Sequence, residues 1–337
     1  MSNKENRRPL MKVEGLKKYY PTKGSDLGSY KEVVHAVDGV DFEIYEGETL
    51  GIVGESGCGK STIGRQLVAL EKPTEGKIIY QGADISSMSI RQLRKIRTQL
   101  QMVFQDSTSS LNPRKQIYDI LAAPMLYHGI VKREDLDNEI NKLLNMVGLP
   151  KTMKYRYPHE FSGGQRQRLG IAKALSLKPR LVVCDEPVSA LDVSVQAQIL
   201  NLLKQLQEEL KLTYVFIAHG LGAVRYVSNR IAIMYLGKFV EIADTNDIFI
   251  NPIHPYTRAL FDASPLADPQ LRGRKRIVLK GEIPSAVNPP RGCRFHTRCP
   301  HAIESCSILE PKLLPIKPGS SHKAACPVVL DKGVENA

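Results

Sequence analysis

A glycine-rich octapeptide directly behind an apolar run constrains this chain more than any other feature. The octapeptide GESGCGKS at residues 54–61 fits the pattern G-x-x-x-x-G-K-[ST], and the run Thr49–Val53 before it predicts a buried strand. Glycines let backbone N–H groups converge on phosphate oxygens, and a helix that follows presents its positive end there. The predicted nucleotide contacts are Gly54, Ser56, Gly57, Cys58, Gly59, Lys60, Ser61 and Thr62.

Within this loop the roles differ. We expect Lys60 to reach the β- and γ-phosphates and Ser61 to ligate Mg²⁺. Cys58 is expected to support packing rather than catalysis. A bare glycine-rich turn would leave the strand before the loop and the helix-like residues after it unexplained.

A second apolar run, Leu181–Cys184, ends in the carboxylates Asp185 and Glu186. Because it predicts a strand that ends beside the phosphate loop, Asp185 is expected to hold Mg²⁺, directly or through water. Glu186 is then placed to orient and polarise the attacking water.

The rest of the chain alternates short apolar runs with helical patterns up to about residue 260, which predicts a doubly wound α/β domain. The spacing predicts helices over Lys132–Val147 and Ala197–Leu210 and a strand over Thr213–Ala218. Twelve of the 21 prolines lie at or beyond Pro252, and beyond Pro265 the chain is Pro-rich and loop-like. The 42% hydrophobic content supports a buried core and excludes a largely disordered chain.

Charge and hydropathy restrict the classes of partner that the chain can have. Lys+Arg 47 against Asp+Glu 35 gives +12, which suits a nucleotide, a nucleic acid or an anionic membrane face, or an ordinary basic surface. Trp is absent and aromatics are 6%, so there is little material for base stacking. Apolar runs stop well short of a membrane span, and the start MSNKENRRPL is not a secretory signal, so we expect a cytoplasmic protein.

Four cysteines gather near the end of the chain, at Cys293, Cys299, Cys306 and Cys326. In a reducing cytosol such a cluster is more typical of metal binding than of disulfides. The spacing lacks the C-x-x-C pairs of most zinc fingers, and four thiolates suit zinc or an iron–sulfur cluster. A mixed site that includes a nearby histidine stays open; the candidates are His296, His301 and His322.

Between the glycine-rich octapeptide and the carboxylates Asp185 and Glu186 lies the segment Phe161-Ser162-Gly163-Gly164-Gln165. It resembles the LSGGQ signature of ABC-transporter ATPases. The resemblance covers nearly the whole chain. It implies a P-loop ABC ATPase domain over residues 1–260, with a RecA-like core and a helical signature subdomain at about 106–175, and a small irregular metal-binding extension over 261–337. It further implies that Ser162, Gly163, Gly164 and Gln165 contact the γ-phosphate of ATP held by an opposing subunit.

Other positions resemble the family one by one. Tyr20 resembles the aromatic that stacks on adenine, with Tyr19 as its rival. Gln105 resembles the Q-loop glutamine near Mg²⁺ and the attacking water, Asp192 belongs to a D-loop-like SALD, and His219 resembles the switch histidine that contacts the γ-phosphate.

Two positions depart from the family pattern. Gly220 replaces the Asp that usually follows the histidine, and Lys173 stands where Arg is common. Gly220 puts in doubt the contact that such an Asp makes. Lys173 keeps the charge but not the planar fork of donors.

Three further segments resemble the second ATPase subunit of dipeptide and oligopeptide importers. They are Ser110-Leu111-Asn112-Pro113-Arg114, His254-Pro255-Tyr256-Thr257 and Asn288-Pro289-Pro290. The resemblance implies a [4Fe–4S] cluster on the four cysteines, with zinc as the alternative.

The implied function is ATP hydrolysis that powers import of di- or oligopeptides, or of nickel or glutathione in a related system. The implied partners are a paralogous ATPase or a second copy, two permeases, and through them a peptide-binding protein, at the cytoplasmic face of the membrane. An ABC ATPase acting on nucleic acid or ribosomes is disfavoured. Only 57 positions separate Gln105 from Ser162, too few for a long coiled coil, and the chain has a single phosphate loop.

Overall fold

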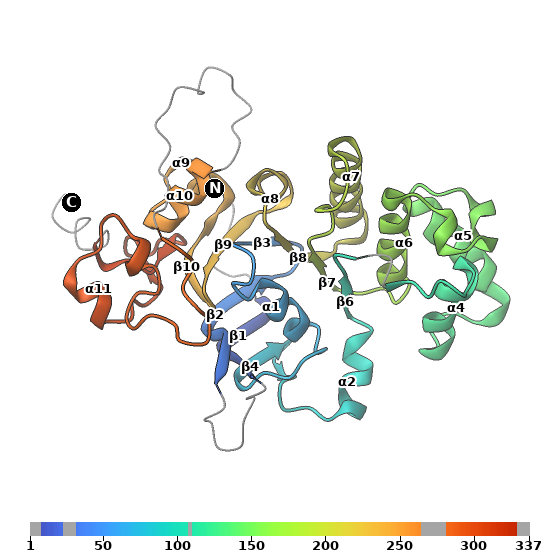
Figure 1. The fold of residues 1–337 in the computed structure, drawn as a ribbon. Helices are drawn as coiled ribbons and strands as arrows, with labels where there is room; N and C mark the ends of the chain where they lie inside the picture. Colours follow the sequence, from blue (N-terminus) through green and yellow to red (C-terminus); the bar gives the residue numbers. More distant parts are fainter. Residues whose placement is uncertain (1–7, 23–31, 107–109, 264–280, 329–337) are drawn as a thin grey trace.

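The computed structural model describes residues 8–22, 32–106, 110–263 and 281–328. Residues 264–280 and 329–337 of the predicted Pro-rich tail, and residues 1–7 of the N-terminal segment, lie outside the described residues. Two sheets with helices around them make up the described part (Figure 1).

The larger sheet carries the predicted strands. Its order among the described residues is β11 (Leu314–Pro315), β12 (Lys323–Ala324), β10 (Lys238–Asp244), β9 (Arg230–Tyr235), β3 (Thr49–Val53), β8 (Thr213–Ala218), β7 (Leu181–Asp185) and β6 (Leu100–Val103). Strands β9, β3, β8, β7 and β6 are parallel, whereas β10, β12 and β11 add antiparallel pairs at one edge. The parallel part confirms the α/β prediction.

The smaller sheet is antiparallel, in the order β2 (Val33–Tyr45), β1 (Pro9–Pro21), β4 (Glu75–Tyr80) and β5 (Ala83–Asp84). Helix α1 (Lys60–Leu67) packs between this sheet and the lower face of the larger one. The odd residues of β7 and β8, such as Val183 and Val215, enter this core. Their even neighbours enter a second core on the opposite face, so both strands are buried on both sides and lack polar alternation.

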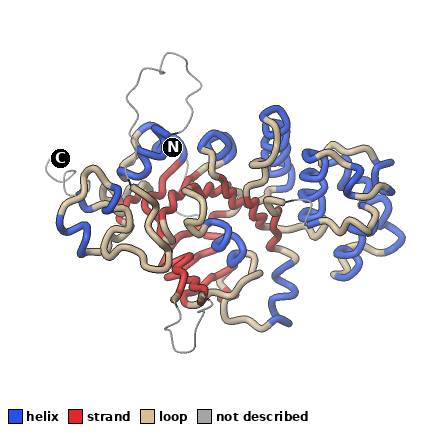
Figure 2. Tube along the Cα trace, viewed as in Figure 1, coloured by secondary structure: helices blue, strands red, loops and turns tan. Residues whose placement is uncertain are grey.

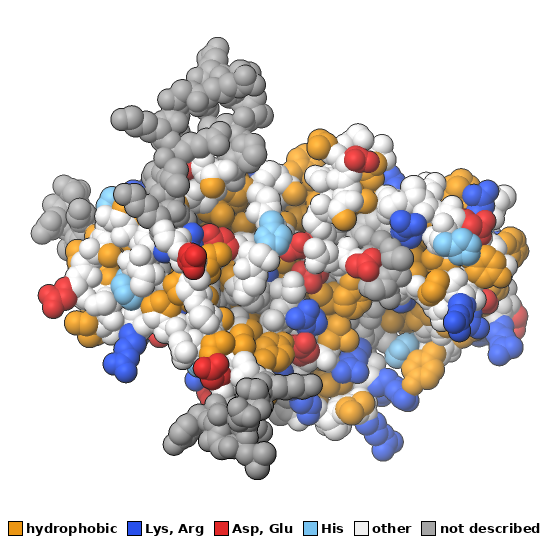
Figure 3. Space-filling model, in the orientation of Figure 1, with side chains coloured by type: hydrophobic (Ala, Val, Ile, Leu, Met, Phe, Trp, Pro, Cys, Tyr) orange, Lys and Arg blue, Asp and Glu red, His pale blue; other side chains and the backbone are white. Residues whose placement is uncertain are grey.

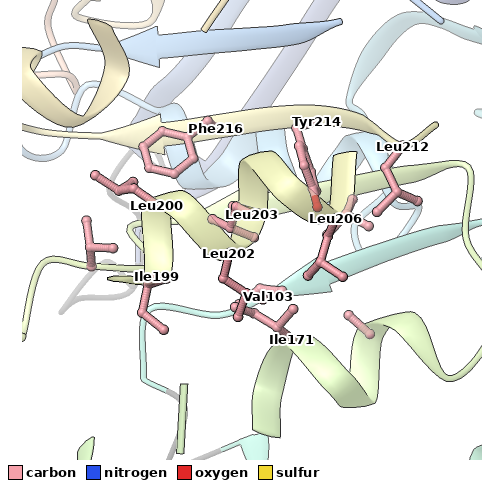
Figure 4. Close-up of a cluster of buried hydrophobic side chains, with 14 of the residues drawn as sticks. Val103, Ile171, Ile199, Leu200, Leu202, Leu203, Leu206, Leu212, Tyr214 and Phe216 are labelled. Carbon is pink, nitrogen blue, oxygen red and sulfur yellow. The ribbon is translucent and has the colours of Figure 1, made fainter. Parts of the chain in front are cut away.

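Helices cover that opposite face. α7 (Val193–Leu210) lies over the sheet beside α8 (Leu221–Val227), and its leucines meet Tyr214 and Phe216 of β8 and Ile171 of α6 (Figure 4). The predicted helix over Ala197–Leu210 is confirmed, but it begins four residues earlier. Val193 is exposed, so no apolar period marks that first turn.

A helical lobe projects from the β6–β7 side of the sheet (Figure 1). It consists of α4 (Ile117–Tyr127), α5 (Leu136–Met146) and α6 (Gly163–Leu175), with the 3₁₀ turns η1 (Arg133–Asp135), η2 (Lys151–Tyr155) and η3 (Pro158–Glu160). The predicted helix over Lys132–Val147 is thus a 3₁₀ turn followed by α5. α2 (Ile90–Arg97) lies on the core side of the lobe.

The C-terminal extension, residues 281–328 as described, is built mostly of loops (Figure 2). It follows α9 (Thr245–Ile250) and α10 (Pro255–Ala263) and holds η5 (His296–Arg298), α11 (Glu304–Ile308), β11 and β12. Pairing of β12 with β10 joins it to the larger sheet, which the sequence pattern did not indicate. Over the described ranges, no helix combines the length and apolarity needed to cross a bilayer.

Candidate functional site

The phosphate loop connects β3 to α1 and is tightly enclosed. A side chain at Gly54 would collide with the carbonyl of Met234, and one at Gly59, where φ is +107°, with the carbonyl of Ala36. Only glycine fits at either position. Lys60 is buried, and its Nζ donates to the carbonyl oxygens of Gly54 at 2.8 Å and Glu55 at 2.9 Å.

Cys58 turns its side chain into the core beneath the smaller sheet. Burial raises the pKa of its thiol, so the sulfur stays protonated at neutral pH. Its placement suits packing better than chemistry.

The loop meets the end of β7 at a serine–carboxylate contact. Ser61 Oγ donates to Asp185 Oδ1 at 2.8 Å. Asp185 is buried, and that burial raises the pKa of its carboxyl, whereas the bond from Ser61 lowers it. A hydroxyl and a carboxylate are oxygen ligands of the kind that Mg²⁺ takes in nucleotide sites.

Three side chains from neighbouring strand ends meet at Glu186. Gln105 Nε2 donates to Glu186 Oε2 at 2.9 Å, and His219 Nε2 lies 2.6 Å from Glu186 Oε1. These residues follow β6, β7 and β8, which are adjacent and parallel, so their carboxyl ends share one edge of the sheet. The predicted catalytic residues are therefore brought together.

The backbone of Glu186 is strained. Its φ is +48°, in the left-handed region, which costs a non-glycine residue on the order of 1–3 kcal/mol. Its N–H donates to the carbonyl of Ile217 at 2.9 Å and helps to hold that conformation. Strain at a carboxylate between a glutamine and a histidine is typical of a functional position.

The signature residues form a second group, on α6 and against α7. Ser162 caps α6: its Oγ accepts from Gln165 N–H at 3.3 Å, and Gln165 Oε1 accepts from Ser162 N–H at 3.0 Å. This capping box occupies the side chain of Gln165. Gly163 packs near Leu191, and a side chain at Gly164 would collide with Val195 Cγ1.

The two tyrosines of β1 have different neighbours. Tyr20 donates to Glu71 Oε2 at 2.5 Å, and burial raises the pKa of its phenol, while Thr62 of α1 lowers it. Tyr19 contacts Asp38, and its ring lies tilted against that of His35 with the ring centres 4.4 Å apart. Tyr20 is therefore the tyrosine beside α1.

Three further family positions lie at helix ends and in the helical lobe. Asp192 is exposed and occupies the N-cap position of α7 without a side-chain capping bond. Gly220 occupies the same position in α8, with open space around it. Lys173 Nζ donates to the Ser110 carbonyl at 2.7 Å, and burial lowers its pKa, so this lysine ties α6 to the segment after Gln105.

The four C-terminal cysteines lie in one small region. Cys306 and Cys326 are buried, while Cys293 and Cys299 are half-buried against the core. Burial, together with the neighbouring Cys306, Cys326 and Cys299, raises the pKa of Cys293 to about 11. In the described part of the chain, no three His, Cys, Asp or Glu side chains converge as metal ligands do.

Contacts from the C-terminal part reach the phosphate loop at Glu55, which sequence reasoning missed. The backbone N–H of Glu55 donates to Tyr256 Oη at 3.1 Å, and its carboxylate pairs with Arg298 at 3.0 Å. Because Tyr256 and Arg298 lie more than 200 positions from Glu55, no periodic pattern in the sequence indicates that they are in contact. The one available hint was the motif His254–Thr257, whose physical role the sequence alone did not show.

Two family descriptions match the chain. The family described as "ABC transporter" matches residues 37–189, and "Oligopeptide/dipeptide transporter, C-terminal region" matches residues 240–306. Among solved structures, the dimeric MJ0796, a bacterial ABC transporter cassette, superimposes with a TM-score of 0.61 at 29% identity, over 70% of this chain and 98% of that one.

Curated relatives match over almost the full length. The oligopeptide transport ATP-binding protein AppF of Bacillus subtilis is 50% identical over 95% of this chain and 98% of its own. The oligopeptide transport ATP-binding protein OppF of Escherichia coli is 46% identical over 96% and 97%. The chain therefore belongs to the oligopeptide transport ATP-binding proteins, a family of ABC-transporter ATPases.

Proposed function

We propose that this ATPase powers the import of di- or oligopeptides through a membrane ABC transporter. The observation that carries the catalytic part is the meeting of Gln105, Glu186 and His219 beside the Ser61–Asp185 contact. The peptide substrate rests on the relatives' names and on the oligopeptide/dipeptide family match at residues 240–306. Nickel or glutathione is the alternative cargo.

In this mechanism the chain positions ATP and water. The loop N–H groups and Lys60 hold the phosphates, and Tyr20 stacks on the adenine. Ser61, Gln105 and Asp185 would hold Mg²⁺, whose charge offsets that of the phosphates. Glu186 accepts a hydrogen bond from the attacking water and polarises it, while His219 steadies the γ-phosphate. Positioning and electrostatics supply most of the rate in such chemistry.

The active unit is a pair of cassettes, this chain with a paralogue or with a second copy. Ser162, Gly163, Gly164 and Gln165 lie at the start of α6 rather than in the phosphate loop, and we expect them to contact ATP held by the other subunit, with Asp192 at the seam. A helix N-terminus and backbone N–H groups suit that γ-phosphate. The structural neighbour MJ0796 is itself described as dimeric, which supports this arrangement.

A cavity of about 210 Å³ between the core and the helical lobe suits a permease segment. Its lining combines the exposed side chains of Leu70 and Phe104 with Lys173. Figure 3 shows Lys and Arg side chains gathered over α2 and the helical lobe on the face drawn. This basic surface flanks the cavity and suits a peripheral position at the cytoplasmic, anionic face of the membrane.

For the organisation of the chain, we propose residues 1–260 as nucleotide-binding domain, with a helical subdomain at about 106–175, and 261–337 as an extension. The helical lobe formed by α4, α5 and α6 falls within the proposed helical subdomain and favours that assignment. α10 crosses the boundary at 260, and β12 of the extension pairs with β10 of the larger sheet.

The extension is further proposed to bind a [4Fe–4S] cluster through Cys293, Cys299, Cys306 and Cys326, with zinc as the alternative. Four thiols within one small region have the donor chemistry that either group takes. The test is iron, acid-labile sulfide and zinc per chain after anaerobic purification. About four irons and four sulfides, lost in Cys299→Ser, support the cluster; one zinc without iron supports the alternative, and no metal refutes both.

Reconstitution tests the function directly. The chain, its partner ATPase, the permeases and the binding protein are placed in vesicles, and uptake of labelled dipeptide, oligopeptide, nickel and glutathione is compared. ATP-dependent peptide uptake supports the proposal, whereas uptake of nickel or glutathione alone refutes the peptide substrate. Duplex DNA and ribosomes are expected to leave the ATPase rate unchanged, since the proposed partners do not include nucleic acid.

A further inference from the structure

Glu55, the second residue of the phosphate loop, is hydrogen-bonded to two segments from the C-terminal part of the chain. Its backbone N–H donates to the hydroxyl of Tyr256, at 3.1 Å. Both of its carboxylate oxygens accept from Nη1 of Arg298, at 3.0 Å and 3.3 Å. The first contact fixes the peptide and the second fixes the side chain.

The ion pair between Arg298 and Glu55 is largely shielded from water. The side chain of Arg298 is 8% exposed and that of Glu55 24%, so their attraction is less screened than that of a surface pair. Arg298 also donates to Tyr235 Oη at 3.4 Å and lies over that ring, 5.9 Å from its centre. Tyr235 and Tyr256 pack against Phe295 with ring centres 5.3 Å and 5.4 Å away, which leaves the arginine little freedom.

The same residue touches the phosphate-binding lysine. The carbonyl oxygen of Glu55 accepts from Lys60 Nζ at 2.9 Å and from Cys58 N–H at 3.3 Å. The orientation of the Glu55 peptide therefore bears on where the ammonium group and the following loop N–H groups point. A path of direct contacts runs from Arg298 and Tyr256 through Glu55 to Lys60.

We propose that Arg298, together with Tyr256, is a positioning residue that pre-organises the phosphate loop for ATP through Glu55. The C-terminal extension is then part of the nucleotide site, and Arg298, next to Cys299, couples the cysteine region to it. This inference rests on the phosphate loop being the ATP site. Pre-organisation strengthens binding because less order must be imposed when the ligand arrives.

The test measures affinity for Mg·ATP, by titration of a fluorescent ATP analogue, and the steady-state kcat and KM of the full chain. The variants are Arg298→Gln, Glu55→Gln, their double variant and Tyr256→Phe, with Arg298→Lys for partial rescue. Arg291→Gln is the matched control, since Arg291 is an exposed arginine of the same segment.

We expect Arg298→Gln and Glu55→Gln each to weaken Mg·ATP binding roughly tenfold, from loss of a charged hydrogen bond, with KM rising more than kcat falls. The double variant is expected to match either single variant, because both remove one interaction. Arg298→Lys recovers part of the affinity, and Arg291→Gln leaves it within about twofold. A merely structural role would lower the melting temperature without this split between KM and kcat.

Two results overturn the inference: affinities of Arg298→Gln and Glu55→Gln within twofold of the parent, or losses that add in the double variant. If Arg298→Gln fails to fold, Glu55→Gln and Tyr256→Phe carry the test, since Tyr256→Phe removes only one oxygen. Failure of the unaltered chain to bind ATP would instead refute the assignment of the loop itself. The two failures are therefore distinguishable.

Discussion

The parallel sheet around the phosphate loop and the C-terminal extension are held in place by different interactions. Strands β3, β7 and β8 are buried on both faces by two continuous apolar cores. The extension exposes several apolar side chains instead, among them Ile303, Ile308, Leu309 and Leu314. Besides the pairing of β12 with β10 and the packing of Phe295, its attachment uses largely buried polar contacts, which are Arg298 with Glu55, Arg294 with Asp38 and His322 with Glu241.

This difference implies different sensitivities. Apolar cores lose stability in proportion to the side-chain volume removed. A buried carboxylate can accept hydrogen bonds from several donors at once. Removing that single side chain therefore leaves all of those donors without a partner and lowers stability sharply.

The largest loss of stability is expected at Glu241. This fully buried carboxylate accepts from the N–H groups of Ile253 and His254 at 2.8 Å and 2.9 Å, and lies 2.6 Å from His322 Nε2. Glu241→Ala leaves these groups without a hydrogen-bond partner. It should lower the free energy of unfolding by about 3–5 kcal/mol, measured by urea denaturation. Glu310→Ala, which breaks an exposed pair with Lys238, should cost at most about 1 kcal/mol. Equal losses would contradict the comparison.

The core should respond to lost volume. Leu203 of α7 is 2% exposed, and Leu203→Ala should cost about 2–5 kcal/mol in the same measurement (Figure 4). Leu210, on the same helix but 41% exposed, provides the control, with an expected loss well below that. A Leu210→Ala loss as large as that of Leu203→Ala would show that burial does not govern this helix.

Acid should act on the segment that joins the two regions. Burial lowers the pKa of His254 to about 4, against the raising effect of Glu241, whereas the unfolded chain has about 6.5. Since the folded pKa is the lower one, the unfolded state takes up the proton first as pH falls. Stability is therefore complete above pH 6.5 and declines toward pH 4, by about 2 kcal/mol at pH 5.

The measurement is the free energy of unfolding between pH 7 and pH 4.5, for the parent and for His254→Asn. His254 Nδ1 accepts from Tyr256 N–H at 3.1 Å, and an asparagine oxygen can accept the same bond. The variant should show a shallower decline. Identical slopes would mean that other groups govern the acid response.

The smallest effect is expected at Gly220. Its φ of −90° suits any residue, and space around it is open, so Gly220→Asp can cap α8 without strain. The expected gain is a few tenths of a kcal/mol from the cap, up to about 1 kcal/mol with reduced freedom of the unfolded chain. A lower melting temperature would show that the departure from the family pattern serves stability.

Sequence reasoning was successful where the pattern was periodic or contiguous. The runs over Thr49–Val53 and Thr213–Ala218 coincide with β3 and β8, because a strand buried on both faces needs an unbroken apolar segment. The apolar run that ends in two carboxylates indicated Glu186, the family resemblance indicated Gln105 and His219, and the order of parallel strands explains why the three meet. The left-handed backbone of Glu186 left no mark in the sequence.

Contacts between distant segments could not be predicted. Nothing in the residue order indicates that Arg298 reaches Glu55 or that His322 reaches Glu241, since each pair joins isolated charges across loops. The pairing of β12 with β10 was equally hidden, because a strand of two residues has no period. The extension is therefore the part of the molecule for which the structure adds most.

The role proposed for Glu186 is to polarise the water that attacks ATP. The most direct measurement is ATP turnover together with ATP binding in Glu186→Gln, which keeps the shape of the side chain but removes its charge. We expect turnover to fall by about 10²–10⁴-fold while Mg·ATP affinity stays near that of the parent. Turnover equal to that of the parent would contradict the account.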